Sequence, residues 1–296
     1  MRFIDPRIDF AFKKIFGSED AKDVLISFLE SLLELEGDRR IAALTILDPF
    51  LAPRIKDLKS TILDVQCKDH RGISYVVEMQ VEKVPSFLKR IQYNSAKGYV
   101  QQLGKGEDYS KLRPIIAITI TDYLLFDRFD HCVSLHESRE TITNQPYLSE
   151  ILHYFVELPK FTKDLDACDN MFDQWLYFIR YAGSLEEIPP KMCADPIRHA
   201  FEKARVANMT RDELELYDKA GIAIADVRGR VEQAREDGEE KGRLEERMDM
   251  LLDLLQDRFG SIPDWVRAKL AEADLNTLKG WSKKVFNADQ IELVFQ

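Results

Sequence analysis

The chain has few cysteines, and they show no metal-binding pattern. Its 296 residues contain four cysteines, and no two of them form a CxxC pair. Scattered cysteines are typical of free thiols in a reducing cytosol rather than of a disulfide framework. His131, Cys132 and His136 are the closest grouping of metal-ligating side chains, but a convincing fourth ligand is missing, and there is no HExxH motif. A zinc site is therefore not expected.

Long apolar runs are absent as well. No stretch reaches the length of a membrane span, and residues 1–14 lack the uncharged apolar core of a secretory signal. With 45% hydrophobic residues, the chain is still long enough to bury a full core. These features predict a cytoplasmic protein that does not bind membranes, with one large domain and an appendage.

The chain has no excess of positive charge, since 42 Lys and Arg stand against 52 Asp and Glu. The imbalance is local, however. Residues 1–125 hold 19 basic and 18 acidic side chains, whereas residues 126–296 hold 23 and 34. A basic groove near the N-terminus is compatible with this distribution, so the net charge of −10 does not exclude a nucleic-acid partner.

Residues 59–80 are the most informative stretch, because they predict a β-hairpin. Two alternations of apolar and polar residues flank a turn-like sequence that ends at Gly72. If the loop spans three residues and Gly72 takes a positive φ, Asp64 on the first strand lies opposite Glu78 on the second. The face with Asp64 and Glu78 also holds Gln66 and Gln80. The opposite face can be buried, and it consists of Leu63, Val65, Cys67, Tyr75, Val77, Met79 and Val81.

Two carboxylates that face each other across a sheet destabilise it unless their charge is neutralised. A divalent cation between Asp64 and Glu78 would neutralise it. The alternative is an ordinary solvated sheet face, on which water and salt screen the repulsion.

Periodicity elsewhere predicts helices on both sides of this hairpin. The order of elements indicates an α/β core with a mixed β-sheet flanked by helices. Ser18 is the expected N-cap of the second helix. The expected elements are helices over residues 9–16, 18–36, 86–103 and 169–181, an edge segment over 45–51, a buried strand over 115–120, and further strands within 126–160.

The helix expected over residues 86–103 has a basic, partly aromatic face beside the hairpin. Such a face suits a DNA backbone next to a catalytic pocket, and a solvated helix surface is the alternative. Leu88 and Ile91 are expected on its apolar face. The DNA-binding candidates are Lys89, Arg90, Tyr93 and Lys97.

The C-terminal third is expected to be helical. Residues 206–243 form a charged helical linker, with glycines at 229, 238 and 242 in its most highly charged part, and residues 244–296 form a small helical module. These C-terminal helices are compatible with a homo-oligomer that assembles through them.

The hairpin resembles the core of PD-(D/E)xK nucleases, since Asp64 is followed fourteen residues later by Glu78-x-Gln80. The similarity is closest to the PD-(D/E)xK nuclease family of transposases, also called recombination-promoting nucleases. The other matching segments are residues 9–17, 90–99, 157–160 and 175–178, and residues 258–263 resemble part of a helical domain often found at the C-terminus of these proteins.

The resemblance implies a restriction-endonuclease-like core over residues 1–205 and metal-dependent hydrolysis of DNA phosphodiester bonds in recombination or transposition. Asp64 and Glu78 would hold one or two Mg²⁺ ions, or Mn²⁺ as the alternative ion, with help from the backbone carbonyl of Met79. Gln80 stands where the motif usually has a lysine, so it would position water without supplying charge.

Other residues could compensate for the missing lysine. Lys59 or Lys13 could supply a cation, and Asp9 a third carboxylate, although a helix-surface role for Lys13 and a capping role for Asp9 are the alternatives. Because Gln80 departs from the motif, a catalytically impaired DNA-binding or regulatory protein remains the second hypothesis. A third is an assembly module in which the acidic tail binds a partner chain.

Overall fold

The structure, a computed structural model, describes residues 3–48, 50–51, 61–62 and 64–296. The chain divides into two compact units, Met1–Ile224 and Ala225–Gln296. The boundary falls within one long helix, α6 (Arg211–Phe259). Each unit is considered by itself below.

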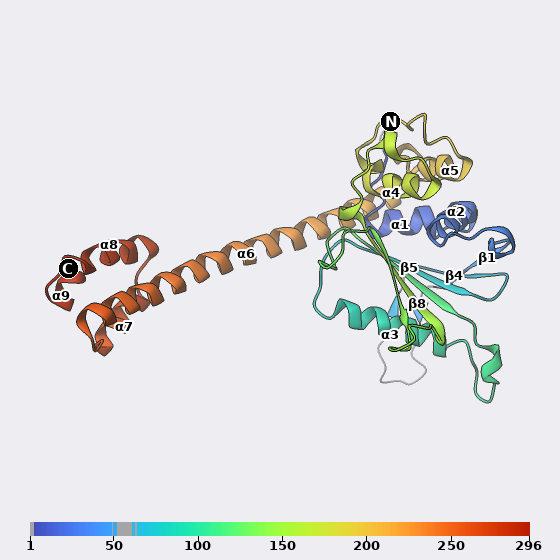
Figure 1. The fold of residues 1–296 in the computed structure, drawn as a ribbon. Helices are drawn as coiled ribbons and strands as arrows, with labels where there is room; N and C mark the ends of the chain where they lie inside the picture. Colours follow the sequence, from blue (N-terminus) through green and yellow to red (C-terminus); the bar gives the residue numbers. More distant parts are fainter. Residues whose placement is uncertain (1–2, 49, 52–60, 63) are drawn as a thin grey trace. The chain divides into compact units, whose positions relative to one another are not determined.

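A mixed six-stranded sheet forms the centre of the first unit (Figure 1), in the order β1-β4-β5-β6-β8-β7. β5, β6 and β8 are parallel, whereas β1, β4 and β7 join antiparallel to their neighbours. A separate pair, β2 (Phe50–Leu51) and β3 (Thr61–Ile62), is antiparallel. The main strands are β1 (Leu44–Leu47), β4 (Val65–Asp69), β5 (Ser74–Gln80), β6 (Ile115–Thr121), β7 (Val133–Ser138) and β8 (Leu148–Glu157).

Helices α1 (Asp9–Phe16), α2 (Lys22–Leu32), α4 (Met171–Tyr181) and α5 (Asp195–Ala204) cover one face of the sheet (Figure 1). Apolar residues at helical spacing form the stripe that each helix buries. Trp175 of α4 is fully buried against Phe16 and Phe28, with ring centroids 5.8 and 6.3 Å away. This aromatic core fixes α1, which carries Asp9 and Lys13, over the sheet.

The opposite face of the sheet is covered by α3 (Phe87–Val100). A Cβ added to Gly98 would lie 2.7 Å from Cδ1 of Ile115, so α3 packs closely on β6 at this point and a larger residue would displace the Ile115 side chain. Phe87 and Ile91 pack against Phe155 of β8. The expectation that Leu88 belongs to the apolar face is wrong, because Leu88 is 40% exposed and Phe87 takes the buried position.

The predicted hairpin is confirmed. Val65 pairs with Val77 and Cys67 with Tyr75, and Gly72 has a φ of 86° in the loop. The predicted apolar face is buried at Val65, Cys67, Tyr75, Val77 and Met79, while Leu63 lies outside the described residues. The same register, continued by one residue, puts position 64 opposite Glu78.

Most of the predicted elements are present, with shifted ends. The first helix has the predicted bounds, and the fully buried strand predicted over 115–120 is β6. The cap predicted at Ser18 is wrong, because its hydroxyl donates to the carbonyl of Lys14 and α2 starts only after a 3₁₀ turn at Glu19–Ala21. The α5 helix was not predicted.

The C-terminal unit has its own small core. α6 ends at Phe259 and is followed by Gly260, which has a φ of 77°, and three short helices then pack on the last turns of α6. They are α7 (Asp264–Ala271), α8 (Leu275–Val285) and α9 (Ile291–Val294). Gly229, Gly238 and Gly242 of the predicted linker lie within the continuous helix.

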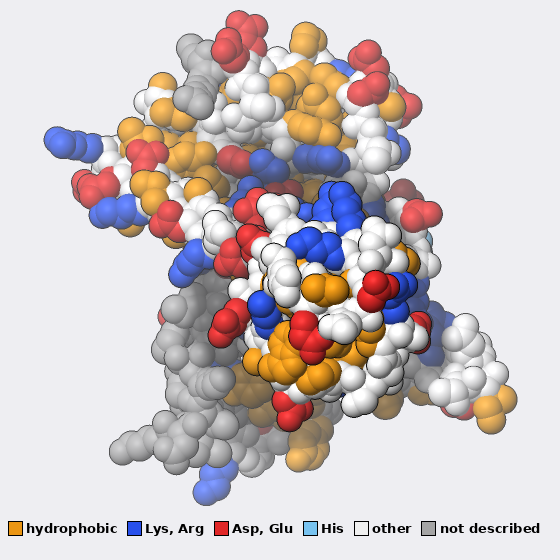
Figure 2. All heavy atoms as spheres, turned by 90° about the vertical axis from the view of Figure 1, so that its left-hand side faces the viewer, with side chains coloured by type: hydrophobic (Ala, Val, Ile, Leu, Met, Phe, Trp, Pro, Cys, Tyr) orange, Lys and Arg blue, Asp and Glu red, His pale blue; other side chains and the backbone are white. Residues whose placement is uncertain are grey.

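Acidic and basic side chains are interspersed on the face of the molecule shown in Figure 2, so no patch of a single sign dominates that view. None of the helices in the described part of the chain is both long enough and apolar enough to cross a lipid bilayer.

Candidate functional site

Asp64 lies directly before β4, where its carboxylate contacts the backbone of β5. The Oδ2 atom accepts a hydrogen bond of 2.8 Å from the N–H of Met79, the residue after Glu78. The side chain of Asp64 is 18% exposed. The hairpin therefore holds the Asp64 carboxylate at the same end of β5 as Glu78.

Helix α1 brings two further predicted residues to Asp64. Nζ of Lys13 lies 3.5 Å from Oδ1 of Asp64 and 2.8 Å from Oδ1 of Asp9. Burial and the neighbouring Asp9 carboxyl raise the pKa of Asp64 to about 7, although the Met79 N–H and Lys13 act in the opposite direction. Asp9 and Asp64 share the ammonium group of Lys13, so its single positive charge does not balance both carboxylates.

Glu78 is held from the other side by α3. Nδ2 of Asn94 donates a hydrogen bond of 3.3 Å to Oε1 of Glu78. Burial raises the pKa of Glu78, while the Asn94 hydrogen bond and the charge of Arg90 lower it. Asn94 was not predicted as a site residue. The signal for it is a polar residue in the buried stripe of α3, where it is only 5% exposed.

Gln80 contacts a cation that the sequence analysis had assigned to DNA binding. Nη2 of Arg90 donates a hydrogen bond of 2.6 Å to Oε1 of Gln80, and Nε2 of Gln80 donates to the carbonyl of Glu82 at 3.2 Å. The guanidinium also lies over the ring of Phe87, 5.2 Å from its centroid. Lys59, the other cation predicted for this position, lies outside the described residues.

Asp64 and Glu78 provide the oxygen donors that Mg²⁺ and Mn²⁺ prefer. Among the residues that the structure describes, no group of three or more His, Cys, Asp or Glu side chains gathers to hold a metal. The donor set still fits Mg²⁺, because this ion commonly takes one or two carboxylates and completes its shell with water and substrate phosphate. Met79, whose backbone carbonyl was predicted to help hold the metal, contacts the site through its N–H, which donates to Asp64.

The other predicted DNA-binding residues lie on the outer side of α3. Lys89 and Tyr93 are exposed, and Lys97 is partly exposed. They share this side of the helix with Arg90, opposite the buried stripe at Phe87 and Ile91. Arg90 therefore links the outer surface of α3 to the end of β5.

The carboxyl ends of β5, β6 and β8 lie side by side, with Gln80, Thr121 and Glu157 in register. Glu157 is 1% exposed, and its Oε1 accepts from the N–H groups of Leu125 and Phe126 at 2.6 and 3.0 Å. Its other oxygen accepts from Lys160 at 2.6 Å. The loop after β6 is thus fixed beside the candidate site, and the matched segment 157–160 serves as its anchor.

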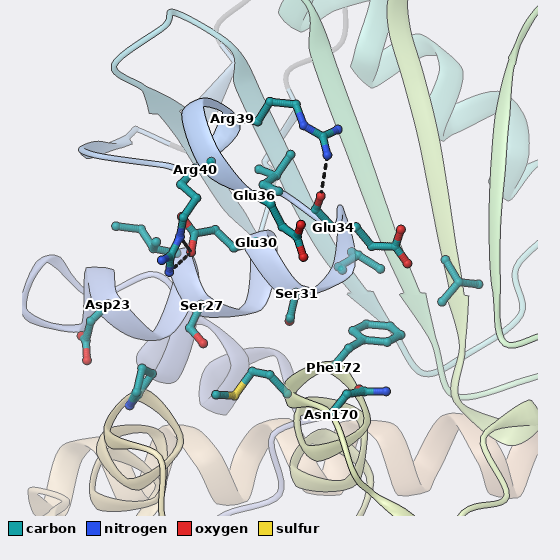
Figure 3. Close-up of a pocket in the computed structure, with 17 residues that line it drawn as sticks. Asp23, Ser27, Glu30, Ser31, Glu34, Glu36, Arg39, Arg40, Asn170 and Phe172 are labelled. Carbon is teal, nitrogen blue, oxygen red and sulfur yellow. Dashed lines mark hydrogen bonds and ion pairs between the residues drawn. The ribbon is translucent and has the colours of Figure 1, made fainter.

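A groove of about 1200 Å³ lies elsewhere, between α2, the turn after it and the start of α4. Figure 3 shows Glu30, Glu34 and Glu36 around it, with Arg40 bonded to Glu30 and Arg39 to the carbonyl of Glu34. None of the predicted site residues that the structure describes lines this groove. Its many carboxylates also make it unsuited to a phosphate backbone.

Comparison with known proteins agrees with this geometry. Residues 6–234 match a family model described as PD-(D/E)XK nuclease family transposase. Among curated proteins and among solved structures, no significant match is found. The match covers Asp64, Glu78, Gln80 and α3, together with the six-stranded mixed sheet that carries them. The chain therefore belongs to the PD-(D/E)XK nuclease family of transposases, with a restriction-endonuclease-like α/β fold.

Proposed function

We propose that this protein is a metal-dependent DNA endonuclease that hydrolyses phosphodiester bonds in recombination or transposition. The observation that carries the proposal is the placement of two buried carboxyl groups at the same end of the hairpin. Asp64 lies directly before β4 and bonds to the backbone of β5, Glu78 lies on β5, and burial raises the pKa of both. Family membership supports the same function.

In this proposal Asp64 and Glu78 hold Mg²⁺ or Mn²⁺. The bound ion would polarise the phosphate and lower the pKa of the attacking water. Met79 and Asn94 orient the two carboxylates through the hydrogen bonds that they donate. Such supporting contacts keep ligands in place, and losing them typically weakens metal binding.

Arg90 takes the place of the cation that the motif usually supplies as lysine. Its guanidinium reaches the position of Gln80 from α3 rather than from the same strand. Arginine stays charged throughout the physiological pH range and can hold a phosphate through two parallel hydrogen bonds. Lys13 is less suited to this role, because it is paired with Asp9 and Asp64.

The DNA backbone would lie along the outer face of α3, on Lys89, Tyr93 and Lys97. Arg90 connects this face to Gln80, so a DNA strand bound along it would continue toward Gln80 and Glu78. The positive charge is local, in agreement with a chain whose excess acidic charge lies in residues 126–296.

The test is nicking of supercoiled plasmid with and without Mg²⁺. The wild-type protein is compared with Glu78→Gln, and Glu36→Gln in the groove of Figure 3 is the matched carboxylate control. We expect Mg²⁺-dependent nicking by the wild type and the control, and at least a hundredfold slower nicking by Glu78→Gln. Equal nicking by all three proteins would overturn the assignment.

A catalytically impaired DNA-binding protein is the second candidate. It is favoured by the fact that Gln80 is bonded at both ends, to Arg90 and to the carbonyl of Glu82, so its amide is already occupied. DNA binding that weakens steeply with salt, without cleavage in Mg²⁺ or Mn²⁺, would identify this function.

A further inference from the structure

Four rings in and after the loop that follows β6 form a continuous stack. His131 lies on Phe129 with ring centroids 4.2 Å apart and a tilt of 10°. Phe129 is followed by Phe126 at 5.5 Å and 31°, and Phe126 by His136 of β7 at 4.8 Å and 25°. The stack therefore runs from the exposed His131 to the partly buried His136.

The inner end of the stack belongs to the packed core. Phe126 and His136 both contact Phe155 of β8 edge to face, with ring centroids 5.1 Å away. Packing accounts for these rings, but not for the outer two. His131 is exposed, and the gain from burying apolar area does not explain why its ring lies flat on Phe129.

The stack lies on the same side of the sheet as Glu78. The parallel register places Glu78, Thr119 and Phe155 in one row across β5, β6 and β8. Two strand spacings separate the ends of this row, which is about 10 Å. The buried Glu157 carboxylate bonds Phe126 N–H and Lys160, and Nζ of Lys160 lies 4.1 Å from the centroid of Phe129. The position of the rings relative to the candidate site is thus firmly set.

The charge of the loop indicates which part of DNA it would contact. Asp127, Arg128 and Asp130 are all exposed, so the loop has no net positive charge for a phosphate backbone. The chemistry it offers is the face of an aromatic ring. Nucleobases stack on such faces once they are unpaired, whereas bases within a duplex already stack on each other.

We propose that His131 and Phe129 form a stacking platform for one unpaired nucleobase, and that the substrate is DNA with unpaired bases beside the cleaved phosphate. This inference rests on the nuclease function proposed above, since it names the substrate of that site. It places a flap, a hairpin end or a single strand ahead of an intact duplex as the preferred DNA.

The test uses two oligonucleotides that differ only in three unpaired bases, one of them 2-aminopurine, at the end of an otherwise identical duplex. Binding is measured in the Glu78→Gln background, so that cleavage does not interfere. We expect quenching of 2-aminopurine fluorescence on binding and tighter binding of the DNA with unpaired bases. His131→Ala should weaken that complex about tenfold and leave duplex affinity unchanged. His131→Tyr, which keeps an aromatic face, should retain the wild-type affinity.

The outcomes separate the two proposals. Equal affinity for both DNAs, or a His131→Ala variant that binds and quenches like the wild type, would overturn the stacking platform. If stacking is observed as expected but no DNA is cleaved in Mg²⁺ or Mn²⁺, the platform stands and the nuclease function fails. If Glu78-dependent cleavage is observed on duplex and unpaired DNA at equal rates, the nuclease function stands and the platform fails.

Discussion

Nη2 of Arg90 lies 2.6 Å from Oε1 of Gln80, so the last residue of β5 is in direct contact with a cation from another element. The contact joins β5 to the first turns of α3. It restores a positive charge within reach of Glu78, whose pKa Arg90 lowers.

Arg90→Ala should slow cleavage about a hundredfold under single-turnover conditions, because a charge aimed at the transition state is worth about that much. Gln80→Lys in the same protein should recover much of the rate by returning the cation to its usual position. Lys68→Ala is the control, since it removes an exposed cation from the other end of the hairpin. A wild-type rate for Arg90→Ala would show that the contact serves only packing.

The stability of the metal-free protein should fall as the pH rises from about 4 to about 7. The folded protein holds a proton on Asp64 up to about pH 7, whereas the unfolded chain releases it near the ordinary value of 3.8. The folded state therefore binds more protons in this window, and the free energy of unfolding decreases with pH. Asp64→Asn should be more stable than the wild type at pH 8, by an amount on the order of 2 kcal/mol.

Chemical denaturation at pH 4 and pH 8 measures this difference. The two proteins should have nearly equal stability at pH 4, where Asp64 is protonated in the folded protein. If Asp64→Asn were less stable than the wild type at pH 8, the raised pKa of Asp64 in the folded protein would be contradicted.

Much of this site could be predicted from the sequence, and the reason is local. The register of the hairpin follows from its alternation and from Gly72, which takes the positive φ that the loop requires. The opposed placement of Asp64 and Glu78 then follows without knowledge of the rest of the fold.

The contacts of α3 could not be predicted, because they depend on long-range packing. Arg90 and Asn94 reach Gln80 and Glu78 from a helix that packs closely on β6, with Gly98 next to Ile115. Similarly, periodicity alone does not decide whether Phe87 or Leu88 is buried. The four stacked rings lie within residues 126–136, but the contacts that anchor them, to Phe155 and Lys160, are again long-range.

Tyr123→Phe should not destabilise the protein. The hydroxyl of Tyr123 is buried near Phe87 and has no hydrogen-bond partner among the residues that the structure describes. Removing an unpaired buried hydroxyl is neutral or gains about 1 kcal/mol. Thermal unfolding at neutral pH measures the change.

Tyr75→Phe is the matched comparison for that variant. The Tyr75 hydroxyl donates to Asp69 at 3.0 Å and accepts from Arg71 at 3.1 Å, within a network that holds the tip of the hairpin. Its loss should cost about 1–3 kcal/mol. Equal stability of the two variants would show that the Tyr75 network contributes little.

Lys89→Ala should weaken DNA binding to a similar extent for every sequence, because a lysine on the outer face of α3 would contact phosphate. The slope of log affinity against log salt is negative, and each lost phosphate contact reduces its magnitude by about 0.9. Fluorescence anisotropy over a range of salt concentrations, in the Glu78→Gln background, measures this slope. An unchanged slope would place the DNA on another surface.

Asp64 and Glu78 should bind one divalent cation together, and binding of Mn²⁺, followed by its electron paramagnetic resonance signal, measures this. We expect one site in the wild-type protein, at least tenfold weaker binding in both Asp64→Asn and Glu78→Gln, and unchanged binding in Glu36→Gln. Wild-type affinity in either of the first two variants would contradict it.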